Sequence, residues 1–205
     1  MEIGTISLNL NTLNCRCYSG KSPKWLIGMV VIIFLMPVVT TFLPKASTDE
    51  NKLLHDFYKS LHILGAVLFL GNIIITGVWM FLAEKSKNIN IIQFGVKAVN
   101  WMDVFFTAPG AALILLSGFI QAEHHGGVYT QSWILAGLML FSLSGIIWLL
   151  ALIPDQHRLI KLSSESNKLQ RKFYEVLHRW YFWGIIATIL PLISLAIMVL
   201  KPKLW

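Results

Sequence analysis

Two long apolar stretches of this 205-residue chain are interrupted by polar and ionisable side chains that could do chemistry. His62 and Asn72 stand in the first stretch, and Asp103 and Gln121 stand in the second. Imidazole nitrogen is a good ligand for haem iron, copper and zinc, and a neighbouring amide can orient such a ligand through a hydrogen bond. These two stretches are therefore the first place to look for a functional site.

Four of the six histidines are expected to gather at one end of the molecule. His55 precedes His62 by seven residues, which places both on the same face of one helix. His124 and His125 follow the second stretch directly. If the two stretches form antiparallel helices, His62 lies level with Gln121, one turn from His124. The pattern predicts a cluster of neutral imidazoles at the mouth of a helix bundle.

Such a cluster suits axial ligation of a b-type haem, or a copper or zinc site. For haem, the candidates are an axial ligand, two alternative partners and two supporting amides: His62, His124, His125, Asn72 and Gln121. For a metal ion, the candidate ligands are His62 and His55. The structural alternative is that His62 only hydrogen-bonds Gln121 or a carbonyl group and fixes helix packing. Whether the chain is an enzyme stays open at this point.

Asp103 belongs to a second hypothesis, because it starts a seam of polar and small residues spaced alternately by three and four. The first stretch carries a matching seam, and two such seams are expected to pack against each other. Asp103 would either cap helix amides or pair with a loop lysine. The rival functional class is transport or handling of copper or a small solute along the path from Asn72 to Asp103. A third is a non-catalytic accessory subunit whose seams only specify packing.

The elements that carry these residues are predicted to be transmembrane helices. The chain is 56% hydrophobic and only 13% charged, so a soluble domain would lack the polar surface to cover it. We predict an all-α integral membrane bundle of five transmembrane helices, with four in the core and one before it. The helices are expected at residues 25–44, 61–83, 101–122, 133–153 and 180–200. In domain terms, this gives a cytoplasmic tail at 1–24, the additional N-terminal helix at 25–44 and the four-helix core at 59–205.

The net charge of +7 is concentrated in loops, which predicts membrane topology and argues against a nucleic-acid surface. The tail, the connector 84–100 and the connector 155–179 are net basic, whereas the turn that contains His124 has no Lys or Arg. The positive-inside rule therefore predicts a cytoplasmic N-terminus in a bacterial inner membrane. The expected partners are the lipid bilayer and either a second copy of the chain or a membrane redox protein.

Several runs of the chain resemble a known family. They are LHILGAVLFLGN at 61–72, DVFFTAPG at 103–110, PDQ at 154–156, and the Trp180 helix with its terminal proline at 202. They are similar to a bacterial family of predicted integral membrane proteins, domain of unknown function 2269. The resemblance covers about Lys59 to Pro202 and implies a four-helix membrane core.

More distantly, the pattern is similar to the four-helix membrane protoporphyrinogen oxidase and to the copper-resistance D proteins. Both open with a helix that carries an early histidine, and the oxidase resembles this chain in a proline-containing next helix and a terminal Lys-Pro. The resemblance implies a haem-ligating role for His62. The oxidase has a lysine where this chain has Gly137. The resemblance therefore implies haem binding and does not extend to the oxidation of protoporphyrinogen.

Overall fold

A computed structural model describes residues 52–165 and 169–205, and all regular secondary structure in these ranges is helical. Four helical stretches are long and apolar enough to cross a membrane: Leu54–Lys85, Ile89–Glu123, Ser132–Ser164 and Arg171–Leu200. This confirms the four-helix membrane core. The predicted tail at 1–24 and the fifth helix at 25–44 lie outside the described residues.

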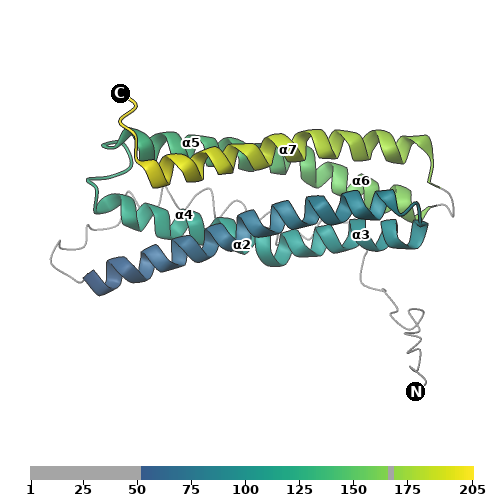
Figure 1. Cartoon of the computed structure of the whole chain (residues 1–205), viewed down its shortest axis with the longest axis horizontal. Coiled ribbons are helices and arrows are strands. Elements are labelled where there is room, and N and C mark those ends of the chain that lie inside the picture. Colours follow the sequence, from purple (N-terminus) through teal and green to yellow (C-terminus); the bar gives the residue numbers. More distant parts are fainter. Residues whose placement is uncertain (1–51, 166–168) are drawn as a thin grey trace, which may run out of the picture.

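Consecutive spans run in opposite directions, so the bundle is antiparallel in chain order, as Figure 1 shows. Two of them are interrupted by a π-helical turn. The bounds are α2 Lys52–Lys85, α3 Ile89–Met102, a π turn Asp103–Thr107, α4 Ala108–Glu123, α5 Ser132–Ile147, a π turn Trp148–Leu152, α6 Ile153–Ser164 and α7 Arg171–Leu200. We call the end with the turn after α4 the His124 end. The opposite end, with the turns after α2 and α6, is the basic end.

Local chemistry sets the helix ends. The side chain of Asn88 caps α3 by accepting a hydrogen bond from Asn90 N at 3.0 Å. The turn after α4 has positive φ angles at Gly126 (+88°) and Gly127 (+103°), which glycine adopts without a Cβ clash. Lys201 ends α7 in the left-handed conformation, just before Pro202.

The helices extend further toward the basic end than predicted. The 34 residues of α2 span about 51 Å, well beyond a hydrocarbon core of about 30 Å. The connector expected at 84–100 is instead a tight turn followed by α3, which starts at Ile89 and runs into the second span. The third span likewise continues to Ser164, and the fourth starts at Arg171 rather than at residue 180. The sequence predicts a short helix at about 91–99 and partial helix within 155–179, but not that these helices continue the spans.

Because α2 and α3 extend into the predicted connector, the register between α2 and α4 differs from the predicted one by about one helical turn. Gly110 lies against Gly65 and Phe69, whereas pairing of His62 with Gln121 would place it near Asn72. His62 likewise lies opposite Ile114 instead of Gln121. The turn between the helices is centred near residue 87, because both helices continue through most of the predicted connector.

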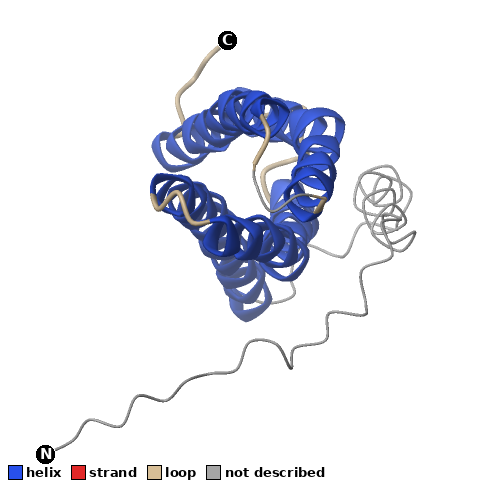
Figure 2. Cartoon of the chain, turned by 90° about the vertical axis from the view of Figure 1, so that its right-hand side faces the viewer, coloured by secondary structure: helices blue, strands red, loops and turns tan. Residues whose placement is uncertain are grey.

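The main hydrophobic core occupies the half of the bundle at the basic end. Its buried side chains come from α2, α3, α6, α7 and the second π turn: Met80, Ile92, Val96, Val99, Leu152, Leu159, Ile160, Phe173, Val176, Leu177, Trp180 and Ala187. In the half at the His124 end, the helices pack mainly as two pairs, α2 with α4 and α5 with α7. Figure 2 shows all the spans running side by side along the view.

Small residues bring the helices of each pair close together. A Cβ on Gly65 would lie 2.9 Å from Gly110 O, so neither α2 nor α4 has room for a larger residue here. Between α5 and α7, Ser144 Oγ donates to Ala187 O at 2.6 Å, and Ser194 Oγ donates to Gly137 O at 3.0 Å. These contacts hold each pair as a unit.

Candidate functional site

The strongest polar cluster inside the bundle surrounds Asp103, which is only 7% exposed and starts the first π turn. Its Oδ1 accepts hydrogen bonds from Thr107 Oγ1 at 2.8 Å and Asn72 Nδ2 at 3.3 Å. Its Oδ2 accepts from Gln156 Nε2 at 2.5 Å. Asn72 Nδ2 also donates to Thr107 Oγ1 at 2.8 Å. We call these four residues the Asp103 site; they join α2, the first π turn and α6.

The donors that reach Asp103 are neutral amides and a hydroxyl. No Lys, Arg or His of residues 52–165 and 169–205 forms an ion pair with it. An ionised carboxyl accepts hydrogen bonds only, so three donors suit the anionic form. A buried carboxylate without a cation is costly, however, and such groups are found where a proton or an ion is handled.

Both π turns lie at the Asp103 site. Asp103 begins the first turn, and Trp148 begins the second, with Gln156 four residues after that turn ends. The buried indole N–H of Trp148 lies close to the Asp103 carboxyl without completing a well-formed hydrogen bond. π turns widen a helix locally and occur often at functional sites. The sequence interpretation found the proline-containing second span but missed the interruption of the third.

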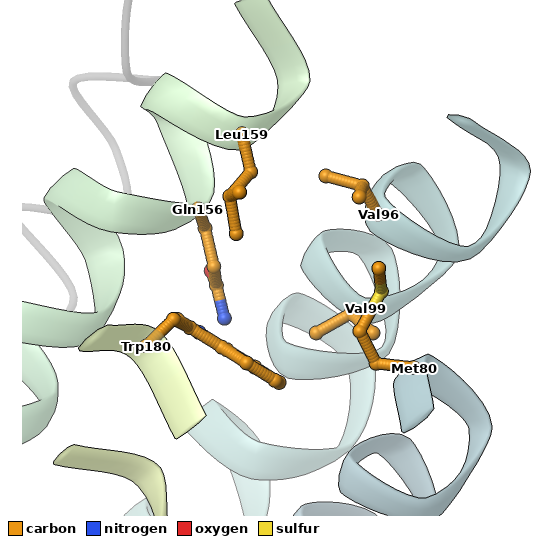
Figure 3. A pocket seen from close by; sticks show the side chains of 6 residues that line it. All are labelled: Met80, Val96, Val99, Gln156, Leu159 and Trp180. Atoms are coloured by element: carbon orange, nitrogen blue, oxygen red, sulfur yellow. The ribbon is translucent and has the colours of Figure 1, made fainter. Parts of the chain in front are cut away.

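A small pocket extends the Asp103 site toward the basic end. Figure 3 shows it between α2, α3, α6 and α7, lined by Met80, Val96, Val99, Gln156, Leu159 and Trp180. The volume open to the centre of a water molecule is about 10 Å³, which is room for about one water. The Gln156 amide points toward the Trp180 ring, and the indole N–H of Trp180 is buried without a hydrogen-bond partner.

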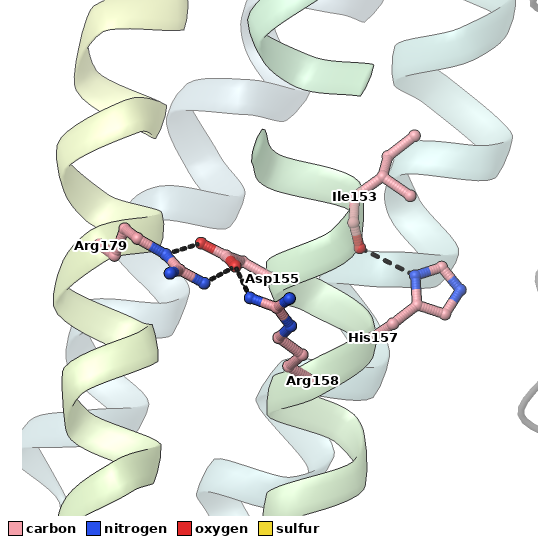
Figure 4. Close-up of polar contacts among 5 residues, drawn as sticks. All are labelled: Ile153, Asp155, His157, Arg158 and Arg179. Atoms are coloured by element: carbon pink, nitrogen blue, oxygen red, sulfur yellow. Dashed lines mark hydrogen bonds and ion pairs between the residues drawn. The ribbon is translucent and has the colours of Figure 1, made fainter. Parts of the chain in front are cut away.

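Asp155, the residue before Gln156, anchors the same helix start to α7. It is 2% exposed and accepts hydrogen bonds from Nε of Arg179 at 2.8 Å and from its Nη2. Arg158 Nη1 approaches the same carboxylate at 3.7 Å. Figure 4 shows both guanidinium groups on Asp155, with His157 on another side of α6. Two consecutive residues of α6 thus hold the second span and α7.

His62 lies between α2 and α4, nearer the His124 end. Its Nδ1 lies 2.9 Å from Ile114 O and 3.2 Å from Ser117 Oγ. A carbonyl oxygen accepts only, so Nδ1 carries the proton and Nε2 keeps its lone pair. Gly118 makes room for the ring, since a Cβ there would lie 3.0 Å from His62 Cε1. The donor chemistry of His62 therefore fits one axial haem ligand.

The other predicted haem and metal ligands have their own neighbours. The His124 ring packs edge-on against His55, with ring centroids 4.9 Å apart. The His125 ring packs against Trp133, and its Nδ1 lies 3.2 Å from Gln121 O.

The structure thus brings His55 and His124 together but gives neither His124 nor His125 a contact with His62 in the described part of the chain. Gln121 reaches the backbone of Tyr58, and Asn72 belongs to the Asp103 site. No group of three or more His, Cys, Asp or Glu that could hold a metal ion occurs within 52–165 and 169–205. Haem and metal binding by these residues stay predictions.

Gln156 and Trp148 are the members of this region that sequence reasoning did not assign to a site. The one signal for them is the PDQ run at 154–156, where an acid and an amide directly follow a proline. Proline removes a backbone donor, so this run predicts the end of a helix. The π turn before Pro154 instead lets the helix continue and directs Gln156 inward.

The family described as "Predicted integral membrane protein (DUF2269)" matches residues 56–202, which is most of the chain. No curated protein and no solved structure matches the chain. The chain therefore belongs to this family of predicted integral membrane proteins.

Proposed function

We propose that this member of the family binds a proton at Asp103 and uses that binding in coupled transport of a small solute. The observation that carries the proposal is the buried Asp103 carboxyl, whose described hydrogen-bond donors are Asn72, Thr107 and Gln156, all neutral. Removing a carboxylate from water without a cation is costly, and binding a proton removes that charge.

Gln156 supports this proposal, because an amide can serve both protonation states of Asp103. With the carboxylate, the Gln156 NH₂ group donates to Oδ2 at 2.5 Å. When Oδ2 carries a proton, its O–H needs an acceptor, and half a turn of the Gln156 amide presents a carbonyl oxygen instead. Proton binding at Asp103 is then coupled to a rearrangement on α6.

The two π turns supply a place for larger rearrangement. Interrupted helices near the middle of the membrane are a common device of transporters, which move one group of helices against another around a fixed site. The π turns that begin at Asp103 and at Trp148 interrupt neighbouring spans at the level of the Asp103 carboxyl. We assign the basic end to the cytoplasm of a bacterial cell, because basic loops resist translocation.

A pH jump on a solid-supported membrane tests the proposal. Proteoliposomes of the full chain should give a transient charge displacement as protons bind, and Asp103→Asn should abolish it. Asp56→Asn, which changes an exposed carboxyl on α2, is the matched control and should leave the displacement unchanged. An Asp103→Asn protein with the wild-type displacement would exclude Asp103 as the proton site.

A second candidate function is b-type haem binding at His62. One observation favours it: the hydrogen bond from Nδ1 to Ile114 O at 2.9 Å orients the ring and leaves Nε2 for iron, as supporting hydrogen bonds do for metal-bound histidines. Bound haem would supply electron transfer at this side of the bundle. A second protein ligand would have to come from outside the residues that contact His62.

A further inference from the structure

The route by which a proton reaches Asp103 follows from unequal packing in the two halves of the bundle. At the basic end, large apolar side chains from several helices are almost completely buried. They are Met80, Ile92, Leu159, Phe173 and Leu177, each at most 2% exposed. The pocket beside Gln156 has room for about one water at the start of this half. The close-packed side chains of Ile92, Phe173 and Leu177 lie beyond it and offer no chain of polar groups or waters that could pass a proton. This layer separates the Asp103 site from the basic end.

The half at the His124 end is built differently. Its polar and glycine contacts lie inside the pairs, with Gly65 against Gly110 in one pair and Ser194 against Gly137 in the other. The two pairs lie one below the other in Figure 1. Apart from Thr107 in the Asp103 site itself, the largest fully buried side chains of the described chain all lie in the other half. The His124 half therefore lacks a comparable seal between the pairs.

One aromatic contact bridges the two pairs just beside the Asp103 site. The ring of Phe69 on α2 lies 5.2 Å from that of Phe141 on α5, centroid to centroid. Phe69 is 8% exposed and stands one helical turn before Asn72, on the side toward the His124 end. Separation of these two rings would open the Asp103 site to that end.

We propose that Asp103 exchanges its proton with the aqueous phase at the His124 end, through a gate formed by Phe69 and Phe141. The packed apolar layer closes the route to the basic end in this conformation. The inference rests on the proposed function for the identity of the proton site. The access route is a matter of packing and can be measured without any titration of Asp103.

Thiol accessibility of the full-length chain tests the route. Cys15 and Cys17 are first replaced by serine, and Thr107→Cys then places one thiol of similar size beside Asp103. Tyr129→Cys, in the turn after α4, and Asn90→Cys, at the start of α3, serve in separate proteins to identify the two vesicle faces. A charged, membrane-impermeant methanethiosulfonate reagent is applied to each face of oriented vesicles.

We expect the Thr107→Cys protein to be labelled from the face that labels Tyr129→Cys and not from the face that labels Asn90→Cys. An aromatic pair contributes about 0.5–1.5 kcal/mol, so adding Phe141→Ala should raise the labelling rate about 2- to 10-fold. Phe141→Leu keeps more apolar volume and should act in the same direction. Met139→Ala, at a 63% exposed position of the same helix, should have no effect.

Labelling of the Thr107→Cys protein from the Asn90 face, labelling from neither face in any background, or an unchanged rate in both Phe141 variants would each overturn the proposed route. A chain that labels as expected but shows no charge displacement after a pH jump would instead overturn proton binding at Asp103. The two failures are therefore distinguishable.

Discussion

Gln156 Nε2 donates a hydrogen bond to Asp103 Oδ2 at 2.5 Å, although the two residues are 53 positions apart in the chain. The adjacent Asp155 binds Arg179 of α7 through Nε at 2.8 Å. Asn72 on α2 completes the connection on the other side of the carboxyl. All four spans are thus linked at one level, so a rearrangement at Asp103 can reach each of them.

The first prediction concerns the Asp155 ion pair. Arg179→Gln leaves a buried carboxylate without its bidentate partner, so we expect the free energy of unfolding to fall by about 1–3 kcal/mol. This loss is smaller than for a fully buried ion pair, because the Arg179 side chain is 47% exposed and solvent screens the interaction. Arg158→Gln is the matched control; its more distant contact predicts a loss below about 1 kcal/mol. Thermal unfolding in detergent measures both. Equal melting temperatures for the two variants would refute the difference.

The second prediction concerns the close approach of α2 and α4. Gly110→Ala places a methyl group 2.8 Å from Phe69 N, and overpacking of this kind costs about 1–3 kcal/mol. Gly71→Ala, on α2, meets no atom within 4 Å and should be neutral or stabilising by up to about 1 kcal/mol. The melting temperature should therefore fall for Gly110→Ala and stay level or rise for Gly71→Ala. A Gly110→Ala protein as stable as wild type would show that the helices separate here easily.

The third prediction concerns orientation in the membrane. The segment 155–179, which comprises most of α6, the turn after it and the start of α7, is net basic, and the turn after α4 contains no Lys or Arg, so this segment should face the cytoplasm. An impermeant thiol reagent added to intact cells should label Tyr129→Cys and spare Arg171→Cys. The reverse pattern would invert the assigned topology and with it the cellular side of the proposed proton route.

The fourth prediction separates the two interpretations of His62. If the ring only fixes packing, His62→Gln should be tolerated, because an amide keeps a hydrogen bond worth about 1 kcal/mol. If His62 ligates haem, the variant should reach normal membrane levels but lose or shift the visible absorbance of the purified chain. His178→Gln, at the basic end, is the control and should have a smaller effect. A colourless wild type from haem-replete cells would rule out the haem hypothesis.

Much of the fold follows from the sequence alone. Apolar stretches of sufficient length predicted the four membrane spans that the structure contains. The seams at alternating spacings of three and four placed Asn72 and Thr107 on facing sides of α2 and the second span, where they now hydrogen-bond. Patterns of this kind can be recognised because hydrophobic length and helical period do not depend on distant residues.

The details of the site depended on features with no local pattern. No particular residue type marks the π turn before Pro154 in the sequence, yet this turn directs Gln156 to Asp103. The level at which α2 meets α4 depended on where the turn between them lies, and the polar residues of α3, with Lys97 among them, gave no sign that this helix continues into the second span. His124 was expected near His62, but the shift of one turn leaves it against His55.

The most direct test of Asp103 as the proton site is infrared absorption of the full chain in lipid as a function of pH. We predict a carbonyl stretching band of a protonated buried carboxyl that grows as the pH falls and moves to lower frequency in D₂O. Asp103→Asn should lack this band, and Asp56→Asn should retain it. The same pH-dependent band in Asp103→Asn and wild type, or no such band in the wild type, would contradict proton binding at Asp103.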